Sequence, residues 1–111
     1  MSELLIMRKR ILLNASPVLY DRPFTAESFT EDWAVRNAEW RYEDGAFIGR
    51  NPLPGPGCLI SRAQYPGNVL MDCRAQTVLP STHDIDVMWN MDWNEAKNER
   101  DVAYVAGIQG W

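Results

Sequence analysis

The chain of 111 residues has little of what builds a metal site: one histidine, His83, and two cysteines, Cys58 and Cys73. A structural zinc site takes four Cys or His ligands at short, characteristic spacings, and neither cysteine lies in such a motif. We therefore expect no metal site of this kind. The spacing of the cysteines leaves a disulfide open, but two buried free thiols in a reducing cytoplasm are the favoured interpretation.

The chain also lacks an excess of positive charge and a long apolar run. Its net charge is −4, and its one basic cluster is Arg-Lys-Arg at residues 8–10. Nucleic acid binding through phosphates needs a basic face, and a bilayer span needs about 20 apolar residues. The apolar run at residues 11–13 is too short for a secretory signal. These features predict a cytoplasmic protein that binds neither nucleic acid nor a membrane.

What the chain does have is five tryptophans and a hydrophobic fraction of 46%. A chain of this length supports one hydrophobic core, so we expect one domain over residues 14–111 and an N-terminal extension over residues 1–13. Trp33 and Trp40 alternate with charged neighbours. We predict that both pack in the core, because tryptophan has a large area to bury.

Alternating segments and turn residues predict two hairpins. Residues 39–43 and 46–50 flank Asp44-Gly45, a pair that favours a type I′ turn because both central residues take a positive φ there. A second hairpin is expected from residues 58–62 and 69–78, with Pro66-Gly67 at its turn.

The remaining segments also favour strands. Thr25 is a plausible N-cap for a helical turn that ends near Asp32, and the polar residues 92–101 predict a loop or one solvated helical turn. A strand is expected again at residues 102–106. Several short strands joined by hairpins point to an all-β fold, an antiparallel sandwich or barrel.

The most informative segment is residues 83–90, His-Asp-Ile-Asp-Val-Met-Trp-Asn. Its alternation predicts a strand whose wet face carries Asp84 and Asp86. Strict alternation adds Asn90 to this face and turns Trp89 to the other face, unless a bulge intervenes. Carboxylates, an amide and an aromatic ring are the groups that hold a sugar. A solvated strand face with Trp89 in the core is the simpler alternative.

Two more pairs of residues are candidates for contact with a ligand. Asp92 and Trp93 closely follow the segment and extend its concentration of polar and aromatic groups. Arg50 and Asn51 lie where a hairpin strand leaves the sheet, a position from which they can reach a sugar hydroxyl. An arginine at such a position more often forms a surface ion pair.

Five segments together resemble the first half of the YesU-like family: Asp32-Trp33, Glu39-Trp40-Arg41, Glu43-Asp44-Gly45, Gly49-Arg50-Asn51-Pro52 and residues 83–90. Members of this family are bacterial proteins with a concanavalin-A-like lectin/glucanase jelly roll, found among systems that break down plant polysaccharides. The resemblance spans about residues 14–111. It implies an antiparallel β-sandwich that is incomplete in this chain.

Residues 84–89 are also similar to the catalytic strand of laminarinase- and lichenase-type β-glucanases, Glu-Ile-Asp-Ile-Met-Glu. In those enzymes one Glu attacks the anomeric carbon and the other donates a proton, with the carboxyls about 5–5.5 Å apart. Here Asp84 takes the nucleophile position, and Trp89, which is not an acid, takes the acid/base position. The resemblance therefore implies an acidic strand on a concave sheet and favours binding over retaining hydrolysis.

A complete jelly roll of this superfamily takes roughly 180–220 residues, so the chain corresponds to about half of one. Half a sandwich leaves open strand edges and an uncovered apolar face. Three explanations stay open: a truncated chain, a completing second chain, or two copies that pair or exchange strands. The need to cover apolar surface favours self-association.

The pattern and the resemblance together predict a protein of plant-polysaccharide utilisation that binds an oligosaccharide on a concave sheet face without a cofactor. The residues expected to bind it are Asp84, Asp86, Trp89, Asn90 and Trp93.

Three alternatives remain. The first is a hydrolase or lyase in which His83 acts as a general base with Asp84 or Asp86, although a solvent-facing loop histidine is the simpler assignment. The second is a Ca²⁺ site at Asp84, Asp86 and Asp92, whose spacing differs from that of a DxDxDG loop. The third is a structural half-domain that pairs with another chain.

Overall fold

The computed structural model describes residues 2–81 and 84–108. These residues form ten β-strands, one α-helix and one 3₁₀ helix. The helices are η1 (Leu13–Ala15) and α1 (Ala26–Asp32). The strands are β1 (Glu3–Ile6), β2 (Lys9–Leu12), β3 (Trp33–Arg36), β4 (Glu39–Glu43), β5 (Ala46–Arg50), β6 (Cys58–Ser61), β7 (Ile85–Trp89), β8 (Trp93–Asn94), β9 (Glu99–Arg100) and β10 (Tyr104–Ile108). This composition confirms the all-β class.

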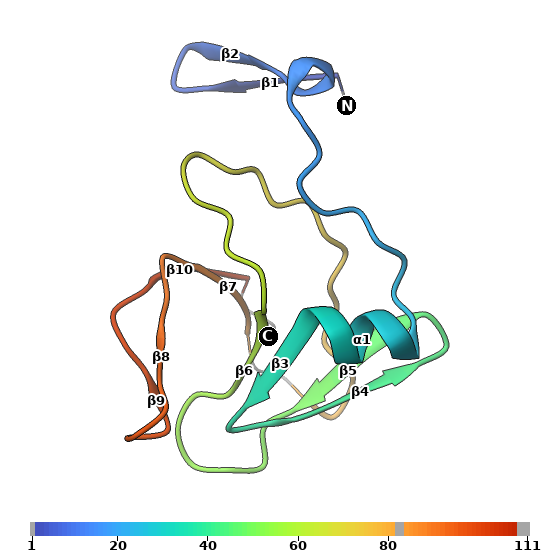
Figure 1. The fold of residues 1–111 in the computed structure, drawn as a ribbon, viewed down its shortest axis with the longest axis vertical. Helices are drawn as coiled ribbons and strands as arrows, with labels where there is room; N and C mark the ends of the chain where they lie inside the picture. The colour runs from blue at the N-terminus through green and yellow to red at the C-terminus, as the bar shows by residue number, and fades with distance from the viewer. Residues whose placement is uncertain (1, 82–83, 109–111) are drawn as a thin grey trace.

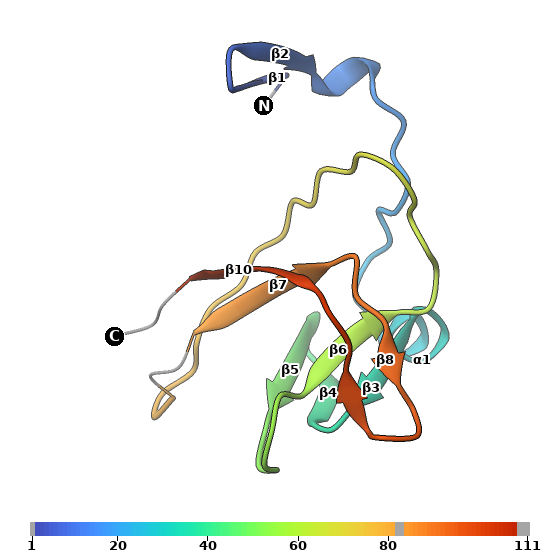
Figure 2. The ribbon, with the colours of Figure 1, turned by 90° about the vertical axis from the view of Figure 1, so that its left-hand side faces the viewer.

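Within the described residues the strands pair two by two, always antiparallel: β1–β2, β3–β6, β4–β5, β7–β10 and β8–β9. Figures 1 and 2 show that the β1–β2 hairpin, inside the expected N-terminal extension, stands apart from the other sheets. The two layers of a sandwich or jelly roll therefore stay a prediction, because they need sheets of more than two strands.

Helix α1 begins where the sequence predicts. The Thr25 side chain accepts a hydrogen bond from the Ser28 backbone N–H at 3.0 Å, and the Ser28 hydroxyl accepts one from the Thr25 N–H at 2.9 Å. This reciprocal pair satisfies two amides that the first helical turn leaves without partners. The helix ends at Asp32, and β3 starts at the next residue.

The β4–β5 hairpin confirms the Asp44-Gly45 prediction. Asp44 and Gly45 have φ values of 47° and 81°, and the pairing runs from Glu43 with Ala46 to Glu39 with Arg50 without a bulge. The right-handed twist of the strands matches a turn with two positive φ angles.

A half-buried aromatic cluster packs between α1 and this hairpin. The Phe47 ring stacks on Phe24 with centroids 4.0 Å apart, and Phe29, Trp33 and Tyr42 pack edge-on to Phe47 at 5.1, 6.2 and 6.5 Å. Trp33 and Trp40 are both half-buried, so each reaches the predicted core position only in part.

The second predicted hairpin is wrong. Strand β6 pairs with β3, with Ala34 opposite Ile60 and Arg36 opposite Cys58, instead of with residues 69–78. Ala34 and Cys58 are both buried, so this long-range pairing gains apolar burial that the local hairpin lacks. Residues 62–81 form a long arch without helix or strand (Figures 1 and 2).

The cysteine prediction is correct in one part and wrong in another. Both thiols are free, but Cys58 is buried and Cys73, on the arch, is exposed. The predicted hairpin of residues 58–62 and 69–78 would have placed the two cysteines on neighbouring strands, but residue 73 belongs to no strand.

The C-terminal part contains two antiparallel pairs. Strands β7 and β10 form one, close to the predicted positions 83–90 and 102–106. The segment expected as a loop or helical turn holds the short β8–β9 hairpin, which an ion pair between Arg36 and Glu95 (2.8 Å) ties to β3. Over residues 2–81 and 84–108 the structure contains no helix with the length and apolar character needed to cross a membrane.

Candidate functional site

The β7–β10 pair is a regular antiparallel ladder. Each of the five β7 residues has one partner on β10, from Ile85 with Ile108 to Trp89 with Tyr104, so no bulge interrupts the alternation. Side chains at successive positions therefore point to opposite faces. The ladder has one acidic face and one apolar face.

The acidic face carries Asp84 and Asp86, which are both exposed. Asp86 lies opposite Gly107 in the ladder. A Cβ at Gly107 would meet the Asp86 Oδ1 and would lie 3.7 Å from the Asp84 Oδ2. The two carboxylates thus converge over the bare backbone of Gly107. This confirms the shared orientation that the alternation predicts.

Met88 follows on the same face and connects it to the β8–β9 hairpin. Its Sδ accepts a hydrogen bond from Arg100 Nη1 at 3.2 Å. The acidic face is therefore bordered by a guanidinium group at the Met88 end.

Burial raises the pKa of the Cys58 thiol above its usual 9.0, and the positive charges of Arg100 and Arg36 offset part of this rise.

The other side of the ladder is the apolar face, formed by Ile85, Val87, Trp89, Tyr104, Ala106 and Ile108. The Trp89 and Tyr104 rings stack with centroids 5.8 Å apart and an interplanar angle of 19°. Trp89 therefore lies away from the carboxylates, and the expected grouping of this ring with Asp84 and Asp86 does not form. Strict alternation without a bulge is the reason.

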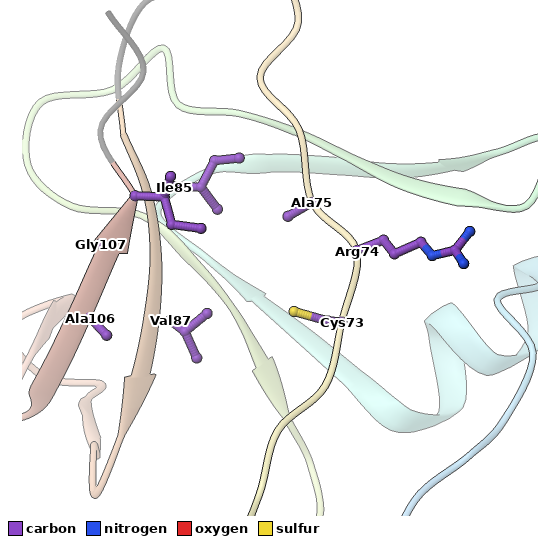
Figure 3. A pocket seen from close by; sticks show the side chains of 8 residues that line it. Cys73, Arg74, Ala75, Ile85, Val87, Ala106 and Gly107 are labelled. Atoms are coloured by element: carbon purple, nitrogen blue, oxygen red, sulfur yellow. The ribbon is translucent and has the colours of Figure 1, made fainter. Parts of the chain in front are cut away.

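A hollow of about 420 Å³ lies beside the apolar face. Ile85 and Val87 point into it from β7, and Cys73 and Ala75 face them from the arch, whereas the Arg74 side chain points away (Figure 3). The hollow is thus on the side of the sheet opposite to the predicted acidic site.

The segment after β7 contains three predicted ligand contacts, Asn90, Asp92 and Trp93. Asn90 and Asp92 lie in the turn between β7 and β8, and Trp93 begins β8. Asn90 takes a left-handed conformation with φ 51°, which asparagine tolerates better than most residues. The Asp92 carbonyl accepts a hydrogen bond from the Asp101 N–H at 2.9 Å, which closes the β8–β9 hairpin. The Trp93 Nε1 is buried and has no hydrogen-bond partner among the described residues.

Arg50 and Asn51 belong to a different sheet. Arg50 lies within 3.8 Å of Glu39 across the β4–β5 pair, and both side chains are exposed. Asn51 holds the following loop, because its Nδ2 donates to the Gly55 carbonyl at 2.8 Å and its Oδ1 accepts from the Leu53 N–H at 3.3 Å. The structure gives these two residues local structural roles and does not bring them to β7.

The sequence offers His83 as a general base and three aspartates as a Ca²⁺ site. His83 lies outside the described residues, so its predicted role stays a prediction. In the described part of the chain, no three His, Cys, Asp or Glu side chains come together as a group that could hold a metal ion.

Sequence reasoning missed the part that Gly107 and Tyr104 play in this ladder. A glycine inside a strand often marks a close approach of another group to the backbone, and residues 104–108 contain Gly107 between Ala106 and Ile108. Recognising their role needs the register of β10 on β7, which local pattern does not contain.

No family model, curated protein or solved structure matches this chain. The resemblance to the YesU-like family therefore stays a prediction carried by the five segments quoted above.

Proposed function

We propose that the protein binds a saccharide on the acidic face of the β7–β10 ladder. The observation that carries the proposal is the convergence of Asp84 and Asp86 over Gly107. Ionised carboxylates accept hydrogen bonds from hydroxyl groups and make them short and strong. The missing side chain of Gly107 leaves room for the Asp86 carboxylate to lie over the backbone beside Asp84.

The charge of this face favours a neutral saccharide. Two carboxylates repel a uronic acid and attract the hydroxyl donors of a neutral sugar. Arg100 borders this face at its Met88 end, but its single charge leaves the two carboxylates in excess. Neutral oligosaccharides of the plant cell wall, such as β-glucans and xylans, are therefore the proposed ligands, in agreement with the family resemblance.

The aromatic contribution differs from the sequence-based expectation. Trp89 faces away from the carboxylates and stacks on Tyr104. Binding on the acidic face therefore depends on hydrogen bonds instead of ring stacking on Trp89. Because hydrogen bonds to a sugar replace hydrogen bonds to water, we expect weak affinity. We place this binding in the cytoplasm, in keeping with the free thiols of Cys58 and Cys73.

The test is a calorimetric titration of the full chain with neutral β-glucan and xylan oligosaccharides, beside an acidic galacturonan oligosaccharide. We expect the neutral ligands to bind and the acidic one to bind at least about tenfold more weakly. The double variant Asp84→Asn/Asp86→Asn should lose about tenfold in affinity for the neutral ligand.

Asp44→Asn is the control, because it makes the same carboxylate-to-amide exchange, for one unit of charge where the double variant removes two, at a turn position that accepts either residue. The proposal fails if no oligosaccharide binds, or if Asp44→Asn weakens binding as much as the double variant does. If incubation with the oligosaccharides produces new reducing ends or unsaturated uronate absorbance, the protein is a hydrolase or a lyase and the binding proposal is overturned.

A further inference from the structure

A second hollow, of about 280 Å³, lies between the C-terminal end of α1 and the start of the arch. We call it the tyrosine hollow, and the residues that line it include Tyr20, Glu31, Asp32, Ser61, Arg62 and Tyr65. We propose that it binds a small zwitterion with an apolar side chain, of the kind that a free α-amino acid provides. The proposal is independent of saccharide binding, because none of these residues belongs to the β7–β10 ladder.

Hydrogen bonds within the protein hold the walls of the tyrosine hollow in place. The Asp32 carboxylate accepts hydrogen bonds from the Tyr20 hydroxyl at 2.9 Å and from Arg22 Nη1 at 3.0 Å. The Trp33 Nε1 donates in turn to the Tyr20 hydroxyl at 3.3 Å. The Arg62 backbone N–H donates to the Asp32 carbonyl at 2.8 Å, which extends the β3–β6 pairing by one residue. Because these walls are already fixed, a ligand has little to reorganise when it binds.

Glu31 and Arg62 bring opposite charges to the tyrosine hollow without pairing with each other. None of the ion pairs between described residues involves Arg62, so its guanidinium keeps its donors for solvent or a ligand. Glu31 and Asp32 share Arg22, whose Nη1 lies 2.8 Å from the first carboxylate and 3.0 Å from the second. One guanidinium balances one of these two negative charges. The Glu31 side chain is 55% exposed against 24% for Asp32, so Glu31 is the carboxylate that a ligand cation can reach.

A zwitterion matches both of these charges. The Arg62 guanidinium pairs with a carboxylate, and the Glu31 carboxylate accepts hydrogen bonds from an ammonium group. A ligand with only one of these charges leaves the other protein group without a partner. The rings of Tyr20 and Tyr65, which are both half-buried, offer apolar surface to a side chain. Pockets for drug-sized ligands measure about 300–1,000 Å³, so the smaller volume of this hollow favours a single amino acid.

The test is a titration of the full chain, followed by the NMR signals of its backbone amides, with three related ligands. L-Leucine carries both charges, N-acetyl-L-leucine carries the carboxylate alone, and L-leucinamide carries the ammonium group alone. We expect L-leucine to shift the amide signals of residues 61–65 with a dissociation constant of about millimolar size, because the ligand is small. Each of the other two ligands should bind at least about threefold more weakly, because each lacks one ion pair.

Two variants remove one charge each from the hollow. Arg62→Gln should weaken the binding of L-leucine at least about threefold and leave L-leucinamide unchanged, because that ligand has no carboxylate. Glu31→Gln should weaken L-leucine by about the same factor and should not weaken N-acetyl-L-leucine, which has no ammonium group.

The matched controls are Arg74→Gln and Glu27→Gln. Arg74 is another exposed arginine of the arch, Glu27 is another exposed glutamate of α1, and neither lines the tyrosine hollow. Neither control should change the affinity for L-leucine. The proposal is overturned if L-leucine leaves the amide signals of residues 61–65 unmoved, if the three ligands bind equally well, or if the controls weaken binding as much as Arg62→Gln and Glu31→Gln do.

Discussion

Asp86 and Gly107 lie directly opposite each other in the β7–β10 ladder, and the Asp86 carboxylate occupies the space that a side chain at position 107 would fill. This relationship links the packing of the sheet to the proposed saccharide site. A substitution at Gly107 therefore tests the site without removing either carboxylate.

Gly107→Ala should weaken saccharide binding and leave the fold intact. The new Cβ meets the end of an exposed side chain, which can move aside at low cost. We expect affinity to fall about tenfold and the free energy of unfolding to change by less than about 0.5 kcal/mol. Calorimetric titration and urea unfolding measure the two quantities.

The same substitution in an Asp86→Asn background is the control for this mechanism. Because the methyl group added by Gly107→Ala is proposed to act through the Asp86 carboxylate, its effect on affinity should be smaller in that background. Additive effects of Gly107→Ala and Asp86→Asn would show that the substitution acts elsewhere.

Gly49→Ala should destabilise the chain. Gly49 pairs with Trp40 across β4 and β5, and a Cβ there would lie 2.5 Å from two atoms of the indole ring. Moving a tryptophan in a packed hairpin costs about 1–3 kcal/mol, to be measured by urea unfolding. Trp40→Leu combined with Gly49→Ala should give a smaller loss than the sum of the two single variants. A neutral or stabilising Gly49→Ala would contradict the contact.

Stability should fall with rising pH in the alkaline range, in part through Tyr20. Partial burial raises the pKa of Tyr20 above its usual 10.0, and hydrogen bonding to the Asp32 carboxylate adds to the rise, whereas the hydrogen bond from Trp33 acts against it. The neutral hydroxyl donates to Asp32 at 2.9 Å. Between 10.0 and the raised pKa the unfolded chain binds fewer protons than the folded one, so the free energy of unfolding decreases as pH rises.

Tyr20→Phe should remove this part of the pH dependence and cost about 2 kcal/mol at neutral pH, since the hydrogen bond to Asp32 and the one from Trp33 are both lost. Asp32→Asn keeps an acceptor without the charge and should make the alkaline slope shallower. Urea unfolding at several pH values from about 8 to about 11.5 measures both effects. An unchanged slope in Tyr20→Phe would show that other groups carry it.

The local elements were predictable because each depends on residues close together in the chain. Thr25 and Ser28 cap α1 through their own side chains, and Asp44-Gly45 takes the positive φ angles that a tight hairpin needs. Alternation at residues 84–88 likewise assigns Asp84 and Asp86 to one face. The alternation also places Trp89 on the other face, and only a bulge, which the β7–β10 ladder does not contain, would have turned it toward the carboxylates.

Choices between distant partners were not predictable. Residues 58–62 could pair with the following segment or with β3, and the burial of Ala34 and Cys58 decided for β3. That choice leaves residues 69–78 without a strand partner in the described chain and exposes Cys73. The structure keeps Arg50 and Asn51 away from β7 for a similar reason, since their partners Glu39 and Gly55 depend on how the hairpin and its loop close.

The sequence by itself determined the all-β class, the helix cap, the first hairpin and the common face of Asp84 and Asp86, because turn angles and the two-residue repeat of a strand are local properties. The tertiary structure decided that Gly107 lies beneath these carboxylates, that Trp89 stacks on Tyr104, and that the hollow lies beside the apolar face. The register between strands separated by many residues controls all three, and that register follows from the balance of burial across the whole chain.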